Sequence, residues 1–197
     1  FHNCNRGKRS LAIDLKTQIG RDAVKRLAAD SDVLLHNYRP GVMDKLGLGS
    51  ETLRASNERL IYLGVSGFGT TGPMSDYPAY DMVIQGLTGI TALQGADNEM
   101  QHINMLVCDK ITAYTVAQAT TAALLARAST GKGQHIDISM LQANLAFMWP
   151  DGMMDKTIED RDGIVDMSPI SDYYQTLDVS DGSIALAPLR DHHFKAL

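Results

Sequence analysis

The sequence has few cysteines and no long apolar run. Its two cysteines, Cys4 and Cys108, lack the spacing of a metal or redox motif, and the six histidines do not group with them. Such cysteine usage favours a reducing, cytoplasmic setting over a disulfide scaffold. The longest uncharged stretch near a helix, 111–126, contains Thr, Tyr and Gln and is too short and too polar to cross a bilayer. No signal peptide is visible, so we expect a cytoplasmic protein that does not enter a membrane.

The chain also lacks an excess of positive charge. Its 18 Lys and Arg residues are outnumbered by 23 Asp and Glu residues, which gives a net charge of −5. Because phosphate backbones are bound by basic faces, this balance argues against a nucleic-acid partner. A local basic cluster at Arg6, Lys8, Arg9 and Lys16 could still serve a small anionic ligand. Hydrophobic residues at 44% and charged residues at 21% are ordinary globular values.

Apolar periodicity predicts alternating strands and helices over the first three quarters of the chain. We expect strands at 10–15, 32–36, 60–65 and 134–139, and helices at 17–29, 42–46, 51–55 (capped by Ser50), 81–87, 109–128 (capped by Asp109) and 140–149. Strands that alternate with helices in this way are typical of a parallel sheet. The expected fold class is therefore α/β, an open parallel sheet with helices on both faces.

A composition change near residue 151 predicts a domain boundary. We expect a large domain over 1–150, an acidic linker over 151–167, and then a hairpin of 173–176 and 183–187 across Asp181-Gly182. The chain starts at Phe1 within a basic turn, without an initiator Met, and ends as a new pattern begins. We therefore expect the N-terminal part of the large domain to be missing and 151–197 to be the linker and the start of an incomplete small domain. No internal repeat or low-complexity segment is visible.

Three short motifs suggest ligands that their contexts do not support. Gly67-Phe68-Gly69-Thr70-Thr71-Gly72 matches G-x-G-x-x-G, but Pro73 follows where a dinucleotide site needs a helix N-terminus. Gly131-Lys132 lacks the Ser or Thr of a phosphate-binding loop and suits a helix C-cap equally well. Asp191-His192-His193 has no third ligand nearby, so we expect no metal site.

Five signatures follow one another in a fixed order. They are Asn37-Tyr38-Arg39-Pro40-Gly41, Ser66-Gly67-Phe68-Gly69, Tyr80-Asp81, Asp109 before a long apolar helix, and Thr130-Gly131-Lys132-Gly133-Gln134. In this order, from about Phe1 to Met148, they resemble the family III (CaiB/BaiF-type) CoA-transferases, a group related to the α-methylacyl-CoA racemases. The resemblance implies that the large domain binds CoA and that the protein is an interlocked homodimer.

The resemblance also implies that Asp109 is a catalytic nucleophile. From its spacing alone, Asp109 is a helix N-cap, and the two roles are compatible because a helix N-terminus stabilises a carboxylate. In the implied reaction Asp109 attacks an acyl-CoA, CoA thiolate leaves, and an aspartyl mixed anhydride forms. A carboxylic acid acceptor attacks next, and the returning thiolate regenerates a thioester and frees Asp109. CoA is thus a substrate, and no tightly bound cofactor is expected.

Further residues gain binding roles from the same resemblance. Gly67 and Gly69 could supply backbone N–H donors to a tetrahedral oxyanion. The implied CoA-binding residues are Ile13, Lys16, Asn37, Tyr38, Arg39, Lys45, Leu46, Tyr77, Pro78, Ala79 and Tyr80. Without the family pattern, the same residues can be explained by structural roles alone, as solvated cations, strand-end turns and a core tyrosine. The acyl group and the acceptor are left unidentified by the sequence.

One position departs from the racemase relatives, which carry His directly before the Asp at position 81. Here that residue is Tyr80, and tyrosine, with an ordinary pKa near 10, is a poor base at neutral pH. His102 does not occupy the matching position. A transferase is therefore favoured, with an α-methylacyl-CoA racemase or epimerase as one alternative and a non-catalytic CoA-binding subunit as another.

Overall fold

The computed structural model describes residues 2–95, 99–165 and 174–195. Its contacts divide the chain into two units, Phe1–Phe147 and Met148–Leu197. The strands are β1 (Val33–His36), β2 (Ile61–Ser66), β3 (His135–Ser139), β4 (Gln175–Val179) and β5 (Gly182–Leu186). The helices are α1 (His2–Asn5), α2 (Gln18–Ala29), α3 (Val42–Lys45), α4 (Ser50–Ser56), α5 (Asp81–Thr88), α6 (Ile90–Gln94), α7 (Val107–Thr130), α8 (Met140–Gly152) and α9 (Asp191–Phe194), with a 3-10 turn at Met154–Thr157.

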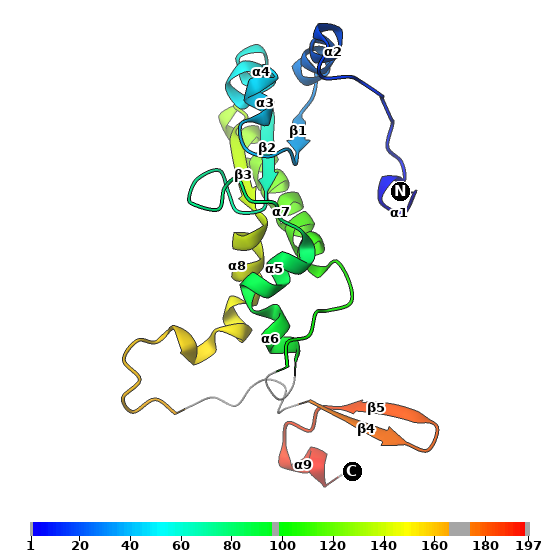
Figure 1. Cartoon of the computed structure of the whole chain (residues 1–197), viewed down its shortest axis with the longest axis vertical. Helices are drawn as coiled ribbons and strands as arrows, with labels where there is room; N and C mark the ends of the chain where they lie inside the picture. Colours follow the sequence, from blue (N-terminus) through cyan, green and yellow to red (C-terminus); the bar gives the residue numbers. More distant parts are fainter. Residues whose placement is uncertain (1, 96–98, 166–173, 196–197) are drawn as a thin grey trace. The chain divides into compact units, whose positions relative to one another are not determined.

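The first unit is built on a parallel sheet in the order β1-β2-β3 (Figure 1). His36 pairs with Gly64, and Gly64 pairs in turn with Asp137, so these three residues form one row across the sheet. Parallel neighbours of this kind need crossover connections, which the helices between the strands supply. The carboxyl ends of β1 and β2 consequently open at the same edge.

Helices cover both faces of the sheet. Tyr62 of β2 belongs to a core cluster with residues of α2, α3 and α4, whereas its neighbour Leu63 packs with Ile138 and Ala143 beside α7. Successive strand residues point to opposite faces, so one buried strand supplies both cores. The expected α/β architecture is confirmed.

Polar contacts fix the amino-terminal edge of the sheet, opposite the edge at which β1 and β2 end. The Arg127 guanidinium, on a residue that is 8% exposed, donates to the Arg59 carbonyl at 2.9 Å and to the Asp32 carboxylate at 2.7 Å. Gly131 ends α7 with φ of 74°, a left-handed conformation that favours glycine at a helix C-cap. The Gly131-Lys132 motif is therefore the end of a helix.

Several predicted boundaries need correction. Residues 10–15 form no strand, because Asp14 ends that segment in a turn: its carbonyl accepts from Thr17 and its carboxylate accepts from the Lys16 N–H at 2.9 Å. Ser50 lies inside α4, where Gly49 is the N-cap residue, so Ser50 is not the cap. The other strands and helices predicted in the first unit are present, with shifted ends.

The second unit holds an antiparallel pair, β4 and β5, in which Val179 pairs with Gly182. The predicted hairpin across Asp181-Gly182 is thus present, although Tyr173, its expected first residue, lies outside the described residues. The division of the chain into a CoA-binding domain and the start of a small domain stays a prediction. No helix in the described ranges has the length and apolarity required to cross a bilayer.

Candidate active site

A cavity of about 840 Å³ lies at the carboxyl ends of β1 and β2. Five segments line it: the exit of β1, the exit of β2, the end of the loop before α5, the first turns of α7, and the start of α8. Its lining residues are Leu35, His36, Asn37, Tyr38, Arg39, Pro40, Val65, Ser66, Gly67, Ser75, Tyr77, Pro78, Ala79, Tyr80, Asp81, Asp109, Thr112, Ala113, Val116 and Met140. An open α/β sheet places ligands at this edge.

The cavity brings together most of the residues singled out from the sequence. These are Asn37, Tyr38, Arg39, Gly67, Tyr77, Pro78, Ala79, Tyr80 and Asp109. The first three follow β1, and the Tyr77–Tyr80 segment leads into α5. Segments that are far apart in the chain therefore line the same cavity, and Asp109 is one of its lining residues.

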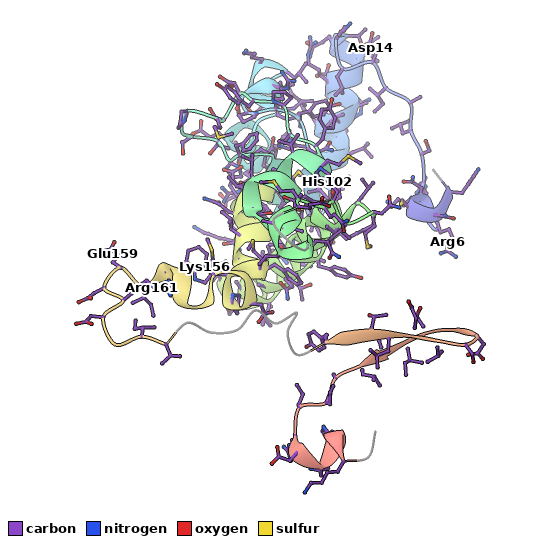
Figure 2. The ribbon with its side chains drawn as sticks, turned by 60° about the horizontal axis from the view of Figure 1, so that its bottom comes forward. Arg6, Asp14, His102, Lys156, Glu159 and Arg161 are labelled. Atoms are coloured by element: carbon purple, nitrogen blue, oxygen red, sulfur yellow. The ribbon has the colours of Figure 1, made fainter. Side chains whose placement is uncertain are left out.

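Other predicted site residues lie outside this cavity. Ile13 and Lys16 flank the Asp14 turn before α2 (Figure 2), Lys45 is exposed at the end of α3, and Leu46 packs against the core. Gly69 is also outside, and its N–H already donates to the Ser66 Oγ at 3.0 Å. That bond occupies the donor that an oxyanion role would need.

Asp109 does not cap its helix. α7 begins at Val107, its N-cap residue Leu106 makes no side-chain cap, and Asp109 lies within the first turn. Instead, the Asp109 N–H donates to the Asp81 Oδ2 at 2.9 Å. The N-terminus of α7 is thus capped from another helix by the carboxylate of Asp81, which is 4% exposed.

Two effects raise the pKa of Asp109. Desolvation by the surrounding structure is the larger, the negative charge of Asp81 adds to it, and Lys110 opposes both. The Asp109 residue is exposed overall, so this desolvation of its carboxyl group is partial. A helix N-terminus alone favours the charged form of a carboxyl, whereas desolvation and Asp81 move the pKa of Asp109 upward.

Beneath Asp109, polar side chains join α7 to α8. The Asn144 amide donates to the Cys108 carbonyl at 3.2 Å and to the Met140 carbonyl at 2.8 Å, and the Thr112 hydroxyl donates to the Cys108 carbonyl at 2.7 Å. Cys108 is fully buried, and burial, assisted by Asp81 and Asp109, raises the pKa of its thiol to about 12. We therefore interpret the Cys108 side chain as part of the buried core and not as a second nucleophile.

His36 is a cavity residue that the sequence reasoning missed. Its Nδ1 accepts from the Tyr38 N–H at 3.3 Å, and burial lowers the pKa of its imidazole more than nearby Asp137 raises it. A β-carbon at Gly64 would lie 3.3 Å from the His36 Nε2 and 3.0 Å from the Asp137 Oδ1, so glycine leaves room for both side chains. An imidazole with a lowered pKa thus lines the cavity at the exit of β1.

Three histidines that were considered for base or metal roles are not among the residues that line the cavity. His102 is exposed in the segment before α7 (Figure 2), and His192 and His193 lie in α9 of the second unit. Within the described ranges, no group of three His, Cys, Asp or Glu side chains is placed to hold a metal ion.

Comparison with known proteins identifies the family. The sequence model of CoA-transferase family III matches residues 1–197. The chain is 35% identical over 200 residues to a succinate–glutarate CoA-transferase of Agrobacterium fabrum, covering 100% of this chain and 50% of that protein. It is 41% identical over 150 residues to an acetyl-CoA:oxalate CoA-transferase of Acetobacter aceti, covering 75% and 39% respectively. The chain belongs to CoA-transferase family III.

Solved structures lead to the same family. A crystal structure of a CaiB/BaiF family protein from Brucella suis matches with a TM-score of 0.81 and 40% identity, over 91% of this chain and 48% of that one. The chain thus spans about half the length of the relatives that it matches most fully.

Proposed function

We propose that the protein transfers coenzyme A between an acyl-CoA thioester and a carboxylic acid, with Asp109 as the nucleophile. The observation that carries the proposal is the position of Asp109, on the wall of the cavity at the carboxyl ends of the strands. Membership of CoA-transferase family III, and relatives named for transfer between CoA thioesters and acids, support the substrate class.

The proposed reaction proceeds through an anhydride. An Asp109 oxygen attacks the thioester carbonyl, the C–S bond breaks, and CoA leaves as the thiolate. The acceptor carboxylate then attacks the aspartyl carbonyl and releases the donor acid, which leaves the acceptor joined to Asp109. The thiolate finally attacks the acceptor's acyl carbon, and this step yields the new thioester and frees the Asp109 carboxylate.

The raised pKa of Asp109 supports a nucleophilic role. A carboxylate of higher pKa is a stronger nucleophile, provided that it remains ionised at the working pH. Its fixed place on the cavity wall would make the attack effectively unimolecular. A carboxylate, otherwise weak toward carbonyl carbons, gains from both effects.

CoA binding is proposed for the two loops that enter the cavity. Arg39 would supply a cation to the phosphates, and Asn37 and Tyr38 would lie along the cofactor, while the Tyr77–Tyr80 segment would cover the pantetheine arm. Ile13, Lys16, Lys45 and Leu46 would then contact the adenine end outside the cavity. Of the two glycines expected to donate to the oxyanion, only Gly67 is kept in this proposal. The Gly69 N–H already donates to the Ser66 Oγ.

The racemase alternative needs a second base beside Asp109. Tyr80 stands where the racemase relatives carry histidine, and its side chain is 73% exposed. Incubation of an (R)-2-methylacyl-CoA in deuterated water separates the two activities. Enzyme-dependent deuterium at C2 would show racemase chemistry, whereas a transferase leaves C2 unlabelled.

A homodimer is proposed as well. Tyr114, Leu125 and Phe147 of the first unit are 75%, 75% and 67% exposed, and a partner subunit would bury such side chains. Light scattering across a dilution series measures the mass. A monomer at micromolar concentration would contradict the proposal.

Trapping of the acylated aspartate tests the proposed function. With an acyl-CoA donor and hydroxylamine, Asp109 should become a hydroxamate that peptide mass spectrometry locates. The Asp109→Asn variant should show no hydroxamate and at least about a thousandfold less transfer. Asp181→Asn, at an exposed aspartate of the β4–β5 turn, is the matched control and should behave like the parent. Transfer by Asp109→Asn within tenfold of the parent would refute Asp109 as the nucleophile. If the parent shows no turnover and Asp109→Asn still binds a CoA resin, the result favours a non-catalytic CoA-binding subunit.

A further inference from the structure

A polar side chain with no place in the proposed chemistry is wholly buried next to Asp81. Gln85 of α5 has an exposure of 0%. It lies four residues after Asp81, so the two side chains share one face of the helix. A buried amide costs free energy unless its hydrogen bonds are made, and an apolar residue of similar size would fill the space without that cost.

Every polar atom of the Gln85 amide is used. Its Nε2 donates to the Asp81 Oδ1 at 2.6 Å and also contacts the carbonyls of Ile103 and Met105 at 3.3 and 3.2 Å. Its Oε1 accepts from the Ile103 N–H at 2.9 Å. A single side chain therefore holds both the capping carboxylate and the segment that leads into α7.

These bonds converge on Asp109. The Asp81 Oδ1 accepts from Gln85, and its Oδ2 accepts from the Asp109 N–H. The Gln85 bond therefore holds the carboxylate that in turn binds the Asp109 backbone. α7 has no side-chain cap of its own at Leu106. The first turn of this helix consequently depends on contacts from α5 for its placement.

We propose that Gln85 is a positioning residue for Asp109, acting through Asp81 and through the Ile103–Met105 segment. This inference rests on the proposed function, because it assigns Gln85 a role only in placing the nucleophile. Gln85 is not among the residues that line the cavity, and its side-chain hydrogen bonds go to Asp81, Ile103 and Met105. Its loss should therefore affect turnover much more than substrate affinity.

Two charged groups, Asp81 and Lys110, act on the pKa of Asp109. Asp81 faces it from α5, and Cys108 and Lys110 flank it on α7. Gln85 adds no charge to this set, but it controls where the Asp81 carboxylate lies. A change at Gln85 should consequently alter both the geometry and the ionisation of Asp109.

Two substitutions separate positioning from mere packing. Gln85→Met keeps the size of the side chain and removes every bond, so we expect kcat to fall by roughly 100-fold while KM for acyl-CoA changes by less than about threefold. The Asp109 backbone N–H should also exchange faster with solvent in native-state hydrogen exchange. Gln94→Met, at an exposed position of α6, is the matched control and should leave both measurements unchanged.

Gln85→Glu tests the donor itself. An ionised Glu cannot donate to Asp81 and repels it, whereas a protonated Glu can share its proton with that carboxylate. Activity relative to the parent should therefore be lowest near pH 8 and should recover as the pH falls toward 5.5. Lost packing alone predicts a ratio that does not depend on pH. If Gln85→Met does not fold, this profile carries the test.

The outcomes keep the inference apart from the proposed function. A parent protein that forms no Asp109 hydroxamate and no new thioester with any donor refutes the function, whatever Gln85 does. An active parent together with a Gln85→Met variant that keeps kcat within threefold, or a Gln85→Glu ratio that is flat with pH, overturns the role of Gln85 alone.

Discussion

A single methyl group at Gly67 should displace one wall of the cavity. A β-carbon built at Gly67 would collide with the β-carbon of Ala79 and would lie 3.5 Å from the Ala79 Cα. Carbon atoms pack at about 3.5–4.0 Å, so the Tyr77–Tyr80 segment has to move by on the order of 1 Å. Gly67 has no positive φ, so Ala can adopt its backbone conformation and the effect is purely steric.

The expected cost follows from this overlap. Forcing an extra carbon into a packed contact costs about 1–3 kcal/mol, and the lower unfolded-state entropy of Ala returns about 0.4–1 kcal/mol. The net loss in the free energy of unfolding for Gly67→Ala should therefore be about 1–2 kcal/mol. Because the displaced segment leads directly into Asp81, kcat should fall by roughly tenfold to 100-fold as well.

The reciprocal substitution is the sharpest test. Ala79→Gly removes the colliding methyl, so the Gly67→Ala/Ala79→Gly double variant should regain most of the stability and activity that Gly67→Ala loses. Urea unfolding of the four members of this cycle, with kcat for each, measures the coupling between the two sites. Additive effects, with no recovery in the double variant, would refute the proposed collision.

Three further changes have expected outcomes. Iodoacetamide should modify exposed Cys4 in the native protein and spare Cys108, whose raised thiol pKa of about 12 and burial both prevent reaction until denaturation; equal rates would contradict this. Because the pKa of Asp109 is raised in the folded state, ionisation of this carboxyl opposes folding above that pKa, so Asp109→Asn should raise the Tm near pH 7 and lose this advantage near pH 3. Arg127→Met should lower the free energy of unfolding in urea by about 1.5–3 kcal/mol, and Asp32→Asn by less, because the Asp32 side chain is 76% exposed.

Local patterns in the sequence were sufficient for most of the sheet. The apolar run 60–65 predicted β2 (Ile61–Ser66), whose first four residues are buried, and the Asn37-Tyr38-Arg39 turn follows β1 directly. Parallel strands bring their carboxyl ends to one edge, so motifs at strand exits could be predicted to share a site. The segment 10–15 failed because alternation alone does not reveal the turn that Asp14 makes.

Contacts between distant residues were not predictable in this way. An aspartate near a helix start suggested a cap at Asp109, whereas the cap comes from Asp81, 28 residues earlier in the chain. Desolvation is the main cause of the raised pKa of Asp109, and Asp81 adds to that shift through the same contact. The spacing of Asp81 and Gln85 was a usable signal, since two polar residues four apart on a helix can bond to each other.

The capping arrangement explains why two carboxylates lie together at one helix terminus. Both oxygens of Asp81 face donors, one on Gln85 and one on the Asp109 backbone. An amide in place of Asp81 would turn an NH2 group toward one of those donors and leave it unpaired, so only a carboxylate satisfies both. A negative charge beside Asp109 is then unavoidable, and it adds to the rise in the pKa of that carboxyl that desolvation causes. The carboxylate that caps the first turn of α7 therefore also adds to the basicity of Asp109, and in our proposal the buried Gln85 amide holds that carboxylate in place.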